Sequence, residues 1–237
     1  MRALVIVPTY NERENIQKLI GATLSQDPRL EILIIDDNSP DKTVDLIKPM
    51  MESEKRIHLL ERSGKLGLGS AYVCGFHYAL EHGFDYILEM DADFSHNPND
   101  IPRLLKAAET ADLVIGSRYC NGVNIINWPI KRLLLSYFAS KYVRTITNMP
   151  IKDPTGGFKC FRSKVLMAIN MDSILSDGYA FQVEMNYRTW AKGYNIIEIP
   201  IVFTERINGV SKMSRKIAWE AAWMVWRLVL LRLLRAL

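Results

Sequence analysis

Short hydrophobic runs alternate with longer amphipathic stretches through the first half of the chain. The runs are rich in β-branched residues and end in polar or turn-forming residues, which is typical of buried strands. They predict five strands, at Ala3–Val7, Glu31–Ile35, Arg56–Glu61, Tyr86–Met90 and Leu113–Ile115. The stretches between them predict helices at Glu12–Leu24, Thr43–Ser53, Leu68–His82 and Asp100–Glu109. This alternation predicts an α/β fold with a mostly parallel sheet covered by helices on both faces.

The second half of the chain is less regular. Its patterns predict a helix at Ile130–Thr147, a strand at Gly157–Phe161, a helix at Ala180–Ala191 and an extended segment at Ile196–Phe203, with Pro200 at a sheet edge. The last stretch, Lys212–Leu237, has the pattern of one continuous helix. We therefore expect a main domain over residues 1–211, followed by an amphipathic helix over residues 212–237.

Length and composition limit the class of protein. The 237 residues are 49% hydrophobic and 24% charged, which describes one globular domain with a substantial core. The three cysteines, Cys74, Cys120 and Cys160, form no CxxC pair, which favours a reducing compartment and argues against a zinc site. The first apolar run is too short for a signal peptide, and no window reaches the roughly 18 apolar residues of a membrane-spanning helix. We therefore expect a cytosolic chain whose contact with a membrane is peripheral.

The net charge of +4 is unevenly distributed along the chain. Residues 200–237 carry seven basic and two acidic side chains, whereas the rest is close to neutral. A basic end on a neutral body indicates a local anionic partner, such as a membrane surface, and not a nucleic acid. Tryptophans, leucines and arginines share this terminal helix, which favours a position at a membrane interface. Packing against the body or against a second copy of the chain is the alternative explanation.

Polar clusters follow four of the predicted strands. They are Pro8-Thr9-Tyr10-Asn11-Glu12, Asp36-Asp37-Asn38-Ser39-Pro40-Asp41, Asp91-Ala92-Asp93 and Gly116-Ser117-Arg118. In open α/β sheets, ligands bind beyond the carboxyl ends of the strands. One such loop would mean little, but four together predict a single site at that edge of the sheet.

Asp91-Ala92-Asp93 carries the clearest chemistry. Residues two apart in an extended segment face the same way, so both carboxylates can reach one cation. Hard oxygen ligands suit Mg²⁺ or Mn²⁺, and a diphosphate can complete the coordination shell. The alternative is a polar turn in which Asp93 caps a helix. His96, just beyond, is expected to support the turn and not to bind the metal.

The other clusters are more ambiguous. Asp37 is interpreted as facing a ribose or base, and Asp41 as a structural cap. The glycines of Gly64-Lys65-Leu66-Gly67-Leu68-Gly69 are explained by tight packing, although Lys65 can reach a phosphate. Arg118, Arg132 and Arg206 fall in segments that border the same edge, where their guanidinium groups would bind phosphate oxygens, unless they are simply solvated. Signatures of common hydrolases, such as GxSxG and HExxH, are absent from the sequence.

These motifs together resemble the family 2 glycosyltransferases of the GT-A fold. Further segments narrow the resemblance to the dolichyl-phosphate (polyprenyl-phosphate) mannose synthases: Asn127-Trp128-Pro129-Ile130-Lys131-Arg132, Asp153-Pro154-Thr155-Gly156-Gly157-Phe158, and Gly209-Val210-Ser211-Lys212-Met213 after Arg206. The resemblance spans about residues 3–215. It implies an inverting, metal-dependent transfer of mannose from GDP-mannose to dolichyl or polyprenyl phosphate, on the cytosolic face of a membrane. Membrane subunits are possible partners, and the sequence does not decide whether they exist.

The resemblance also implies roles for individual residues. It assigns the nucleotide sugar to Pro8, Tyr10, Glu12 and Asp37, with Lys65 nearby; the metal and the diphosphate to Asp91 and Asp93; and the acceptor phosphate to Arg118, Arg132, Ser136, Arg206 and Lys212, with Arg118 and Arg132 also close to the donor. Ser95 stands where some relatives have a glutamine, so a third metal ligand from the protein stays open.

The chemistry agrees with this assignment. A lipid phosphate, with a second pKa of about 6, is already a charged nucleophile at neutral pH and needs no general base. Three alternatives remain open: a family 2 transferase with a UDP-sugar donor, such as a polyprenyl-phosphate glucosyltransferase; a sugar-phosphate nucleotidyltransferase, which usually has a glycine-rich first loop; and a catalytically silent membrane adaptor.

Overall fold

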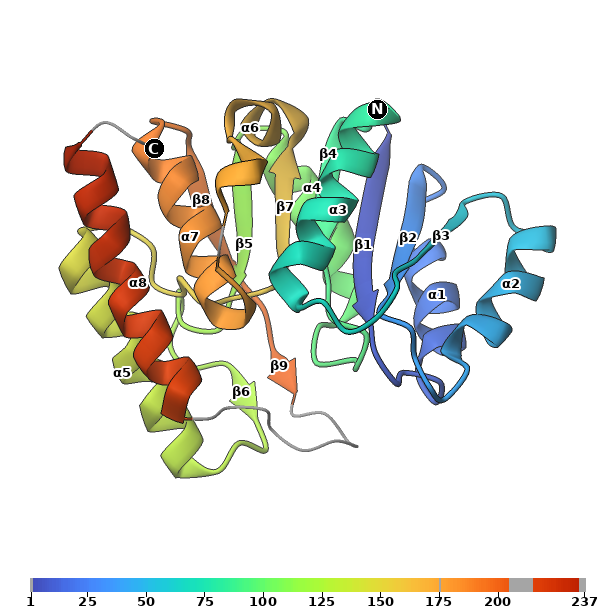
Figure 1. The fold of residues 1–237 in the computed structure, drawn as a ribbon, viewed down its shortest axis with the longest axis horizontal. Coiled ribbons are helices and arrows are strands. Elements are labelled where there is room, and N and C mark those ends of the chain that lie inside the picture. The colour runs from blue at the N-terminus through green and yellow to red at the C-terminus, as the bar shows by residue number, and fades with distance from the viewer. Residues whose placement is uncertain (1, 175, 205–214, 235–237) are drawn as a thin grey trace.

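A mixed seven-stranded sheet runs through the molecule and separates two layers of helices (Figure 1). The computed structural model describes residues 2–174, 176–204 and 215–234, with no side chains described for residues 215–222. The strand order is β3-β2-β1-β4-β7-β5-β8. The strands are β1 (Ala3–Thr9), β2 (Leu30–Asp36), β3 (Ile57–Glu61), β4 (Tyr86–Glu89), β5 (Leu113–Ser117), β7 (Lys159–Arg162) and β8 (Ile196–Pro200).

The order of the strands places a switch point beside β1. From β1 the chain moves outward to β2 and β3, then crosses back to β4 on the other side of β1, and all these neighbours pair in parallel. Ligands of open α/β sheets bind at such a reversal of strand order. Further along, β7 lies antiparallel between β4 and β5, and β8 forms the edge, so Pro200 lies at a sheet edge as predicted.

Helices cover both faces of this sheet. The helices are α1 (Ile16–Leu24), α2 (Thr43–Ser53), α3 (Leu68–Glu81), α4 (Ile101–Ala108), α5 (Ile130–Thr147), α6 (Ser163–Ala168), α7 (Gly178–Ala191) and α8 (Arg215–Leu233), with 3₁₀ turns η1 (Pro98–Asp100) and η2 (Met171–Ser173). Alternate residues of β1 point into two different cores. Leu4 and Ile6 pack with Phe76 of α3, whereas Val5 and Val7 pack with Leu19 of α1. A strand buried on both faces requires apolar residues at successive positions, which explains the continuous hydrophobic run.

The five strands predicted in the first half are confirmed to within two residues at each end. The first helix ends at Leu24 as predicted, but its predicted start is wrong. Helix α1 begins at Ile16 and not at Glu12, because the preceding backbone N–H groups bond to the loop after β2 instead of starting a helix. The amides of Asn11, Glu12 and Arg13 donate to side chains of that loop. Asn11 itself has φ 61°, a left-handed conformation that asparagine tolerates.

In the second half, the predicted α5 is confirmed at both ends, and the predicted helix at Ala180 begins two residues earlier, at Gly178. The sequence did not reveal the short elements α6, β6 (Ile125–Ile126) and β9 (Phe203–Thr204), which contain too few residues to show a period. Strands β6 and β9 form a separate two-stranded sheet. Within the described residues, none of the helices is both long and apolar enough to cross a membrane.

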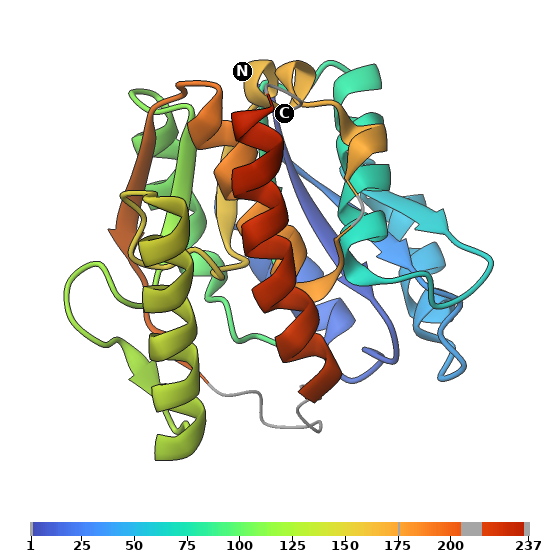
Figure 2. The ribbon, with the colours of Figure 1, turned by 60° about the vertical axis from the view of Figure 1, so that its left-hand side comes forward.

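Helix α8 packs across the body beside α5 and α7 (Figure 2). Met224, Val225 and Leu228 are buried in the same core as the sheet. The packing alternative considered for the terminal helix therefore applies to one of its faces. The opposite face, which includes Trp223 and Trp226, is exposed.

The tight contact of α3 with β1 gives a stability prediction. A Cβ added at Gly75 would lie 2.7 Å from the Cγ2 of Ile6 and 2.9 Å from the Cδ1 of Ile35. Gly75→Ala should lower the free energy of unfolding by about 1 kcal/mol, because overpacking exceeds the gain in helix propensity. Gly21→Ala, in α1 with nothing within 4 Å of the added Cβ, should raise it by about 0.5–1 kcal/mol. Urea unfolding of both variants measures this, and equal effects would contradict the packing argument.

Candidate active site

One pocket of about 470 Å³ opens where the carboxyl ends of β1, β2, β4 and β5 meet. The sequence-predicted residues in its wall are Pro8, Tyr10, Glu12, Asp37, Lys65, Asp91, Asp93, Arg118 and Arg132. The four polar clusters therefore form a single site, as expected from the strand order. Ser136 is absent from the described wall, and Arg206 and Lys212 lie outside the described residues.

At the β2 end of the pocket, Asp37 is held by an arginine that sequence reasoning missed. The Arg62 Nε donates to Asp37 Oδ1 at 2.5 Å, and the Leu66 amide donates to Oδ2 at 3.2 Å. Arg62 directly follows β3, so the rule that drew attention to strand ends would have found it. Asp41 accepts hydrogen bonds from Thr43 and from the Arg13 amide, so its role is structural as predicted, but the N-cap position of α2 is Lys42 and not Asp41.

Lys65 lies at the same end of the pocket. Its Nζ is 4.3 Å from the centre of the Tyr10 ring, a cation–π contact that places a positive charge above an aromatic face. The predicted close packing is confirmed for Gly67 and Gly69 but not for Gly64, where an added Cβ would meet nothing within 4 Å. A Cβ at Gly67 would lie 2.5 Å from Asp177 Oδ2, and one at Gly69 would lie 2.5 Å from the Ser176 carbonyl oxygen.

The turn after β4 presents two carboxylates to the pocket. Ser95 donates its amide proton to Asp93 at 3.1 Å, and Asp91 donates its amide proton to His96 Nδ1 at 3.1 Å. Phe94 between them has φ 59°, an unusual conformation for a bulky residue and one that often marks functional turns. Helix capping does not explain Asp93, because the next helical turn is capped by Asn97.

His96 supports this turn from below. Its side chain is buried and stacks on Phe158, with 5.0 Å between ring centres. Burial holds the pKa of His96 below its ordinary value, so the ring is neutral near pH 7. Because Nδ1 accepts from a backbone amide, the proton is on Nε2. His96 therefore positions Asp91, which agrees with the supporting role expected for it.

The oxygen atoms of this turn fit a hard divalent cation. Asp91 and Asp93 line the pocket, and the buried hydroxyl of Ser95 also lies there without a hydrogen-bond partner among the described residues. Within the same residues, no group of three His, Cys, Asp or Glu side chains could hold a metal alone. Two carboxylates and one hydroxyl leave coordination positions for the oxygens of a bound diphosphate.

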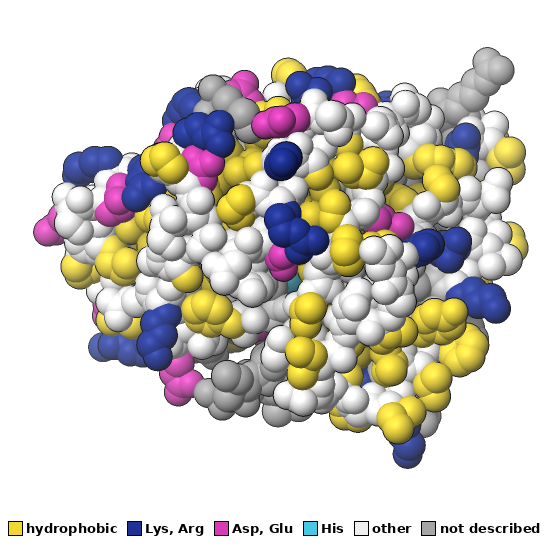
Figure 3. Space-filling model, turned by 180° about the vertical axis from the view of Figure 1, so that it is seen from behind, with side chains coloured by type: hydrophobic (Ala, Val, Ile, Leu, Met, Phe, Trp, Pro, Cys, Tyr) yellow, Lys and Arg dark blue, Asp and Glu magenta, His cyan; other side chains and the backbone are white. Residues whose placement is uncertain are grey.

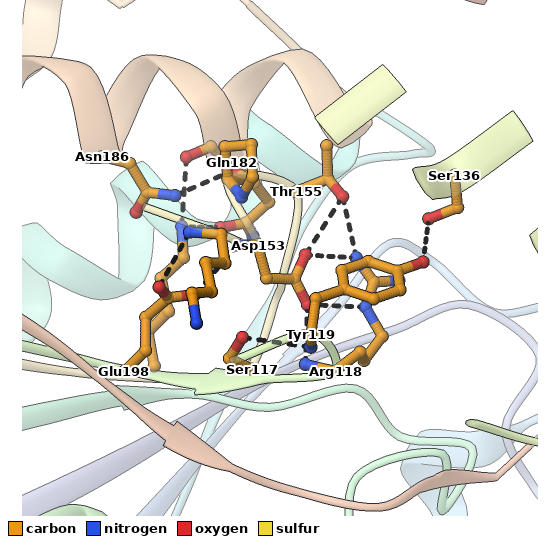
Figure 4. A network of polar contacts seen from close by, with 12 residues as sticks. Ser117, Arg118, Tyr119, Ser136, Asp153, Thr155, Gln182, Asn186 and Glu198 are labelled. Carbon is orange, nitrogen blue, oxygen red and sulfur yellow. Dashed lines mark hydrogen bonds and ion pairs between the residues drawn. The ribbon is translucent and has the colours of Figure 1, made fainter. Parts of the chain in front are cut away.

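The basic side of the pocket is built around a buried ion pair (Figure 4). Arg118 donates from Nε and Nη2 to the two carboxylate oxygens of Asp153 at 2.7 and 2.6 Å, and from Nη2 to Thr155 at 2.7 Å. The pair raises the pKa of Arg118 and lowers that of Asp153, although burial alone would act in the opposite direction. Nη1 has no hydrogen bond to a described residue, so this nitrogen is available for a ligand.

Arg132 and Ser136 lie on α5, at different distances from the pocket. The guanidinium carbon of Arg132 lies 4.2 Å from the centre of the Trp128 ring, and both residues line the pocket. The Ser136 hydroxyl instead accepts from Tyr119 at 2.8 Å (Figure 4). Arg118 and Arg132 therefore both line the pocket, whereas Ser136 is not among the lining residues.

The start of α7 contributes a group of residues that sequence reasoning did not identify. They are Asp177, Gly178, Tyr179 and Gln182. A buried ion pair between Glu184 and Arg188 lies in this helix. Glu184 also accepts a hydrogen bond from the Ser176 hydroxyl, which holds the loop before the helix in place. No motif signals this contribution, because α7 reaches the pocket only through the packing of the second half onto the sheet.

Comparison with known proteins agrees with this geometry. A model of the family "Glycosyl transferase family 2" matches residues 4–169. An undecaprenyl-phosphate mannosyltransferase of Micrococcus luteus is 45% identical over 96% of this chain and 93% of its own length. A polyprenol monophosphomannose synthase of Mycolicibacterium smegmatis is 43% identical over 94% of this chain and 85% of its own length.

Solved structures show the same fold at low sequence identity. Glucosyl-3-phosphoglycerate synthase from Mycobacterium tuberculosis, in complex with Mn²⁺, UDP and glucosyl-3-phosphoglycerate, has a TM-score of 0.66 at 16% identity, over 98% of this chain and 79% of the other. A mannosyltransferase from Pyrobaculum calidifontis, in complex with GDP-Man and Mn²⁺, has a TM-score of 0.54 at 20% identity, over 94% of this chain and 60% of the other. The family match, the relatives and the fold together show that this chain is an enzyme of glycosyl transferase family 2 with the GT-A fold.

Proposed function

We propose that this enzyme transfers mannose from GDP-mannose to a polyprenyl phosphate, such as dolichyl phosphate, with inversion at the sugar carbon and with Mg²⁺ or Mn²⁺ as cofactor. The observation that carries the proposal is that one pocket is lined both by a pair of carboxylates, Asp91 and Asp93, and by a pair of arginines, Arg118 and Arg132. A reaction between two anions, a nucleotide diphosphate and a lipid phosphate, requires both kinds of group. The mannosyltransferase names of the relatives support the choice of sugar and lipid.

The β1–β2 end of the pocket suits the nucleotide. Arg62 holds Asp37 in place through Oδ1, and the remaining lone pairs of the carboxylate can accept hydrogen bonds from ribose or base. Tyr10 offers an aromatic face, and Lys65 above it brings a charge toward the phosphates. Pro8 and Glu12 complete this wall at the end of β1.

Asp91 and Asp93 would hold the divalent cation, with Ser95 as a further oxygen donor. A cation held there would supply positive charge for the diphosphate of the donor. His96 and the left-handed turn at Phe94 keep both carboxylates in position before any ligand binds. Such preorganisation lowers the energetic cost of assembling the site during the reaction.

Arg118 and Arg132 would bind the acceptor phosphate next to the donor. Asp153 fixes the plane of the Arg118 guanidinium and leaves Nη1 for a phosphate oxygen. The phosphate oxygen attacks the sugar carbon from the side opposite the diphosphate, so the C–O bond to the diphosphate breaks as the new bond forms. Because the nucleophile is already charged, no side chain has to remove a proton.

An apolar face beside the pocket suits contact with a membrane. Side chains of α5 are strongly exposed, including Ile130 at 74% and Phe138 at 59%, and those of α8 include Trp226 at 52% and Leu230 at 55%. The two helices lie side by side, and Figure 3 shows hydrophobic side chains gathered at the lower right with Lys and Arg at the margin. Apolar residues bordered by basic ones match the boundary of an anionic bilayer, which is where a polyprenyl phosphate resides. We therefore place the enzyme peripherally, on a cytosolic membrane face, with the basic segment 212–237, which contains α8, as part of the contact.

Removal of a metal ligand provides the first functional test. Asp91→Asn or Asp93→Asn should lower kcat/KM for mannosyl transfer by about a hundred-fold or more, since a charge-stabilising group of the transition state is lost. Both should weaken GDP binding in calorimetry mainly when Mn²⁺ or Mg²⁺ is present. Asp45→Asn, on the exposed face of α2, is the matched control and should behave as wild type. Turnover that survives a chelator would show that the metal assignment is wrong.

Membrane contact can be tested on the two helices. Phe138→Ser combined with Trp226→Ser should reduce co-sedimentation with vesicles containing anionic lipid by about ten-fold or more, because two large apolar groups no longer enter the interface. Met167→Ser is the control, since Met167 is 66% exposed, at least as much as Phe138 and Trp226, but lies on α6. Co-sedimentation that is unchanged in the double variant would favour a protein partner for this face.

Arg206 lies outside the described residues, and its assignment to the acceptor phosphate stays a prediction. Arg206→Ala should leave GDP-mannose affinity nearly unchanged and should slow reaction with the lipid phosphate by about 2–4 kcal/mol in activation free energy. Arg206→Lys should restore activity only in part, since it keeps the charge and loses the fork of two donors. Calorimetry with GDP-mannose and UDP-glucose, beside acceptor kinetics, measures this. Equal losses in donor binding and in transfer would assign Arg206 to the donor site and contradict its assignment to the acceptor phosphate.

A further inference from the structure

A lysine is fully enclosed beneath the pocket, where charged groups are seldom found. Lys159 begins β7 and lies directly opposite Glu89 of β4, and neither residue has any solvent exposure. Its Nζ donates to two oxygens of Gln182, the side-chain Oε1 at 2.5 Å and the backbone carbonyl at 3.1 Å. The reaction described above uses none of these three residues. Burying an ammonium group is costly unless it is paired, so the arrangement requires an explanation.

The contact determines which way the Gln182 amide faces. An ammonium group has donors only, so the amide must turn its oxygen toward Lys159 and its nitrogen away. Burial lowers the pKa of Lys159 to about 8, an effect that the negative charge of Glu89 partly offsets. Lys159 is therefore still protonated near neutral pH and keeps this orientation.

The amide nitrogen faces the pocket. Gln182 lines the pocket although only 3% of it is exposed. A Cβ built on Gly157 would lie 3.8 Å from Gln182 Nε2 and 3.6 Å from His96 Cε1, and both Gly157 and His96 line the pocket beside Asp91. Nε2 carries two N–H bonds. The buried carboxylate of Glu89, whose two oxygens have no hydrogen-bond partner among the described residues, could take no more than one of them.

We propose that Gln182 recognises the sugar of the nucleotide sugar, by donating a hydrogen bond from Nε2 to one of its hydroxyl groups, and that Lys159 is the positioning residue that orients this amide. The inference rests on the proposed function, because it needs a nucleotide sugar with its diphosphate at Asp91 and Asp93. The sugar attached to that diphosphate then lies next to Gly157 and Gln182. A buried donor that a substrate leaves unpaired costs far more than a lost apolar contact, so one amide can discriminate strongly between sugars.

A purely structural role predicts something different. If Lys159 served only to satisfy the carbonyl of α7, its loss would loosen the helix and weaken every ligand of the pocket alike. Recognition of the sugar instead predicts a loss confined to ligands that carry the sugar. The ratio of the Kd for GDP to the Kd for GDP-mannose separates these two roles.

The experiment is calorimetry with GDP and with GDP-mannose in Mn²⁺, on the full chain and on the variants Gln182→Glu, Gln182→Met and Lys159→Met. Each should weaken GDP-mannose by about ten-fold while changing GDP by less than about two-fold. Lys159→Met combined with Gln182→Met should be no worse than Gln182→Met alone, because Lys159 acts through the amide. Thr189→Val, which removes a buried polar group elsewhere on α7, is the matched control and should leave the ratio of the two Kd values unchanged.

Thermal melting identifies which variants fold, and any one folded Gln182 variant is sufficient for the test. Equal weakening of GDP and GDP-mannose, or an unchanged ratio, would overturn the inference. Failure of the proposed donor is a separate result: wild type would then bind neither GDP nor GDP-mannose. In that case the same ratio is measured with UDP and UDP-glucose, and a wild-type sugar preference that survives every Gln182 variant also overturns it.

Discussion

Opposite charges share one pocket wall, and the fold has to keep them from collapsing onto each other. Asp91 and Asp93 lie in the same cavity as Arg118 and Arg132, and a direct contact between the two pairs would remove both from chemistry. For Arg118 the structure supplies a partner of opposite charge from the protein itself. The buried Asp153 engages two nitrogens of Arg118 and so fixes the plane of its guanidinium. The basic part of the pocket is therefore held in one geometry by the protein itself.

Strand β7 connects these features, because it enters the sheet between β4 and β5 in the antiparallel direction. The loop before it carries Asp153, Thr155 and Gly157, and so supplies the partner of Arg118 and part of the pocket wall. Its first residue, Lys159, reaches α7 and joins that helix to the same wall. One inserted strand thus links the acidic turn after β4 with the basic end of β5.

The apolar face of α5 and α8 follows from the same arrangement. Helix α8 buries Met224, Val225 and Leu228 against the body, which leaves Trp223 and Trp226 exposed on its outer side. Arg132, in the first turn of α5, lines the pocket. Under the proposed function, a membrane held against these helices would bring a lipid phosphate to the arginines. Docking and catalysis would then share one element, α5.

The sequence alone determined the parallel half of the fold and the location of the site. Continuous β-branched runs identify strands buried on both faces, and polar residues directly after them identify the carboxyl edge, since both patterns are local in the chain. The pairing of Arg62 with Asp37, of Arg118 with Asp153, and of Lys159 with Gln182 was decided only by the tertiary structure. These partners are 25, 35 and 23 residues apart, and no period or motif connects them. Which polar or charged side chains form a pair depends on how the helices pack on the sheet, and that packing exists only in the assembled fold.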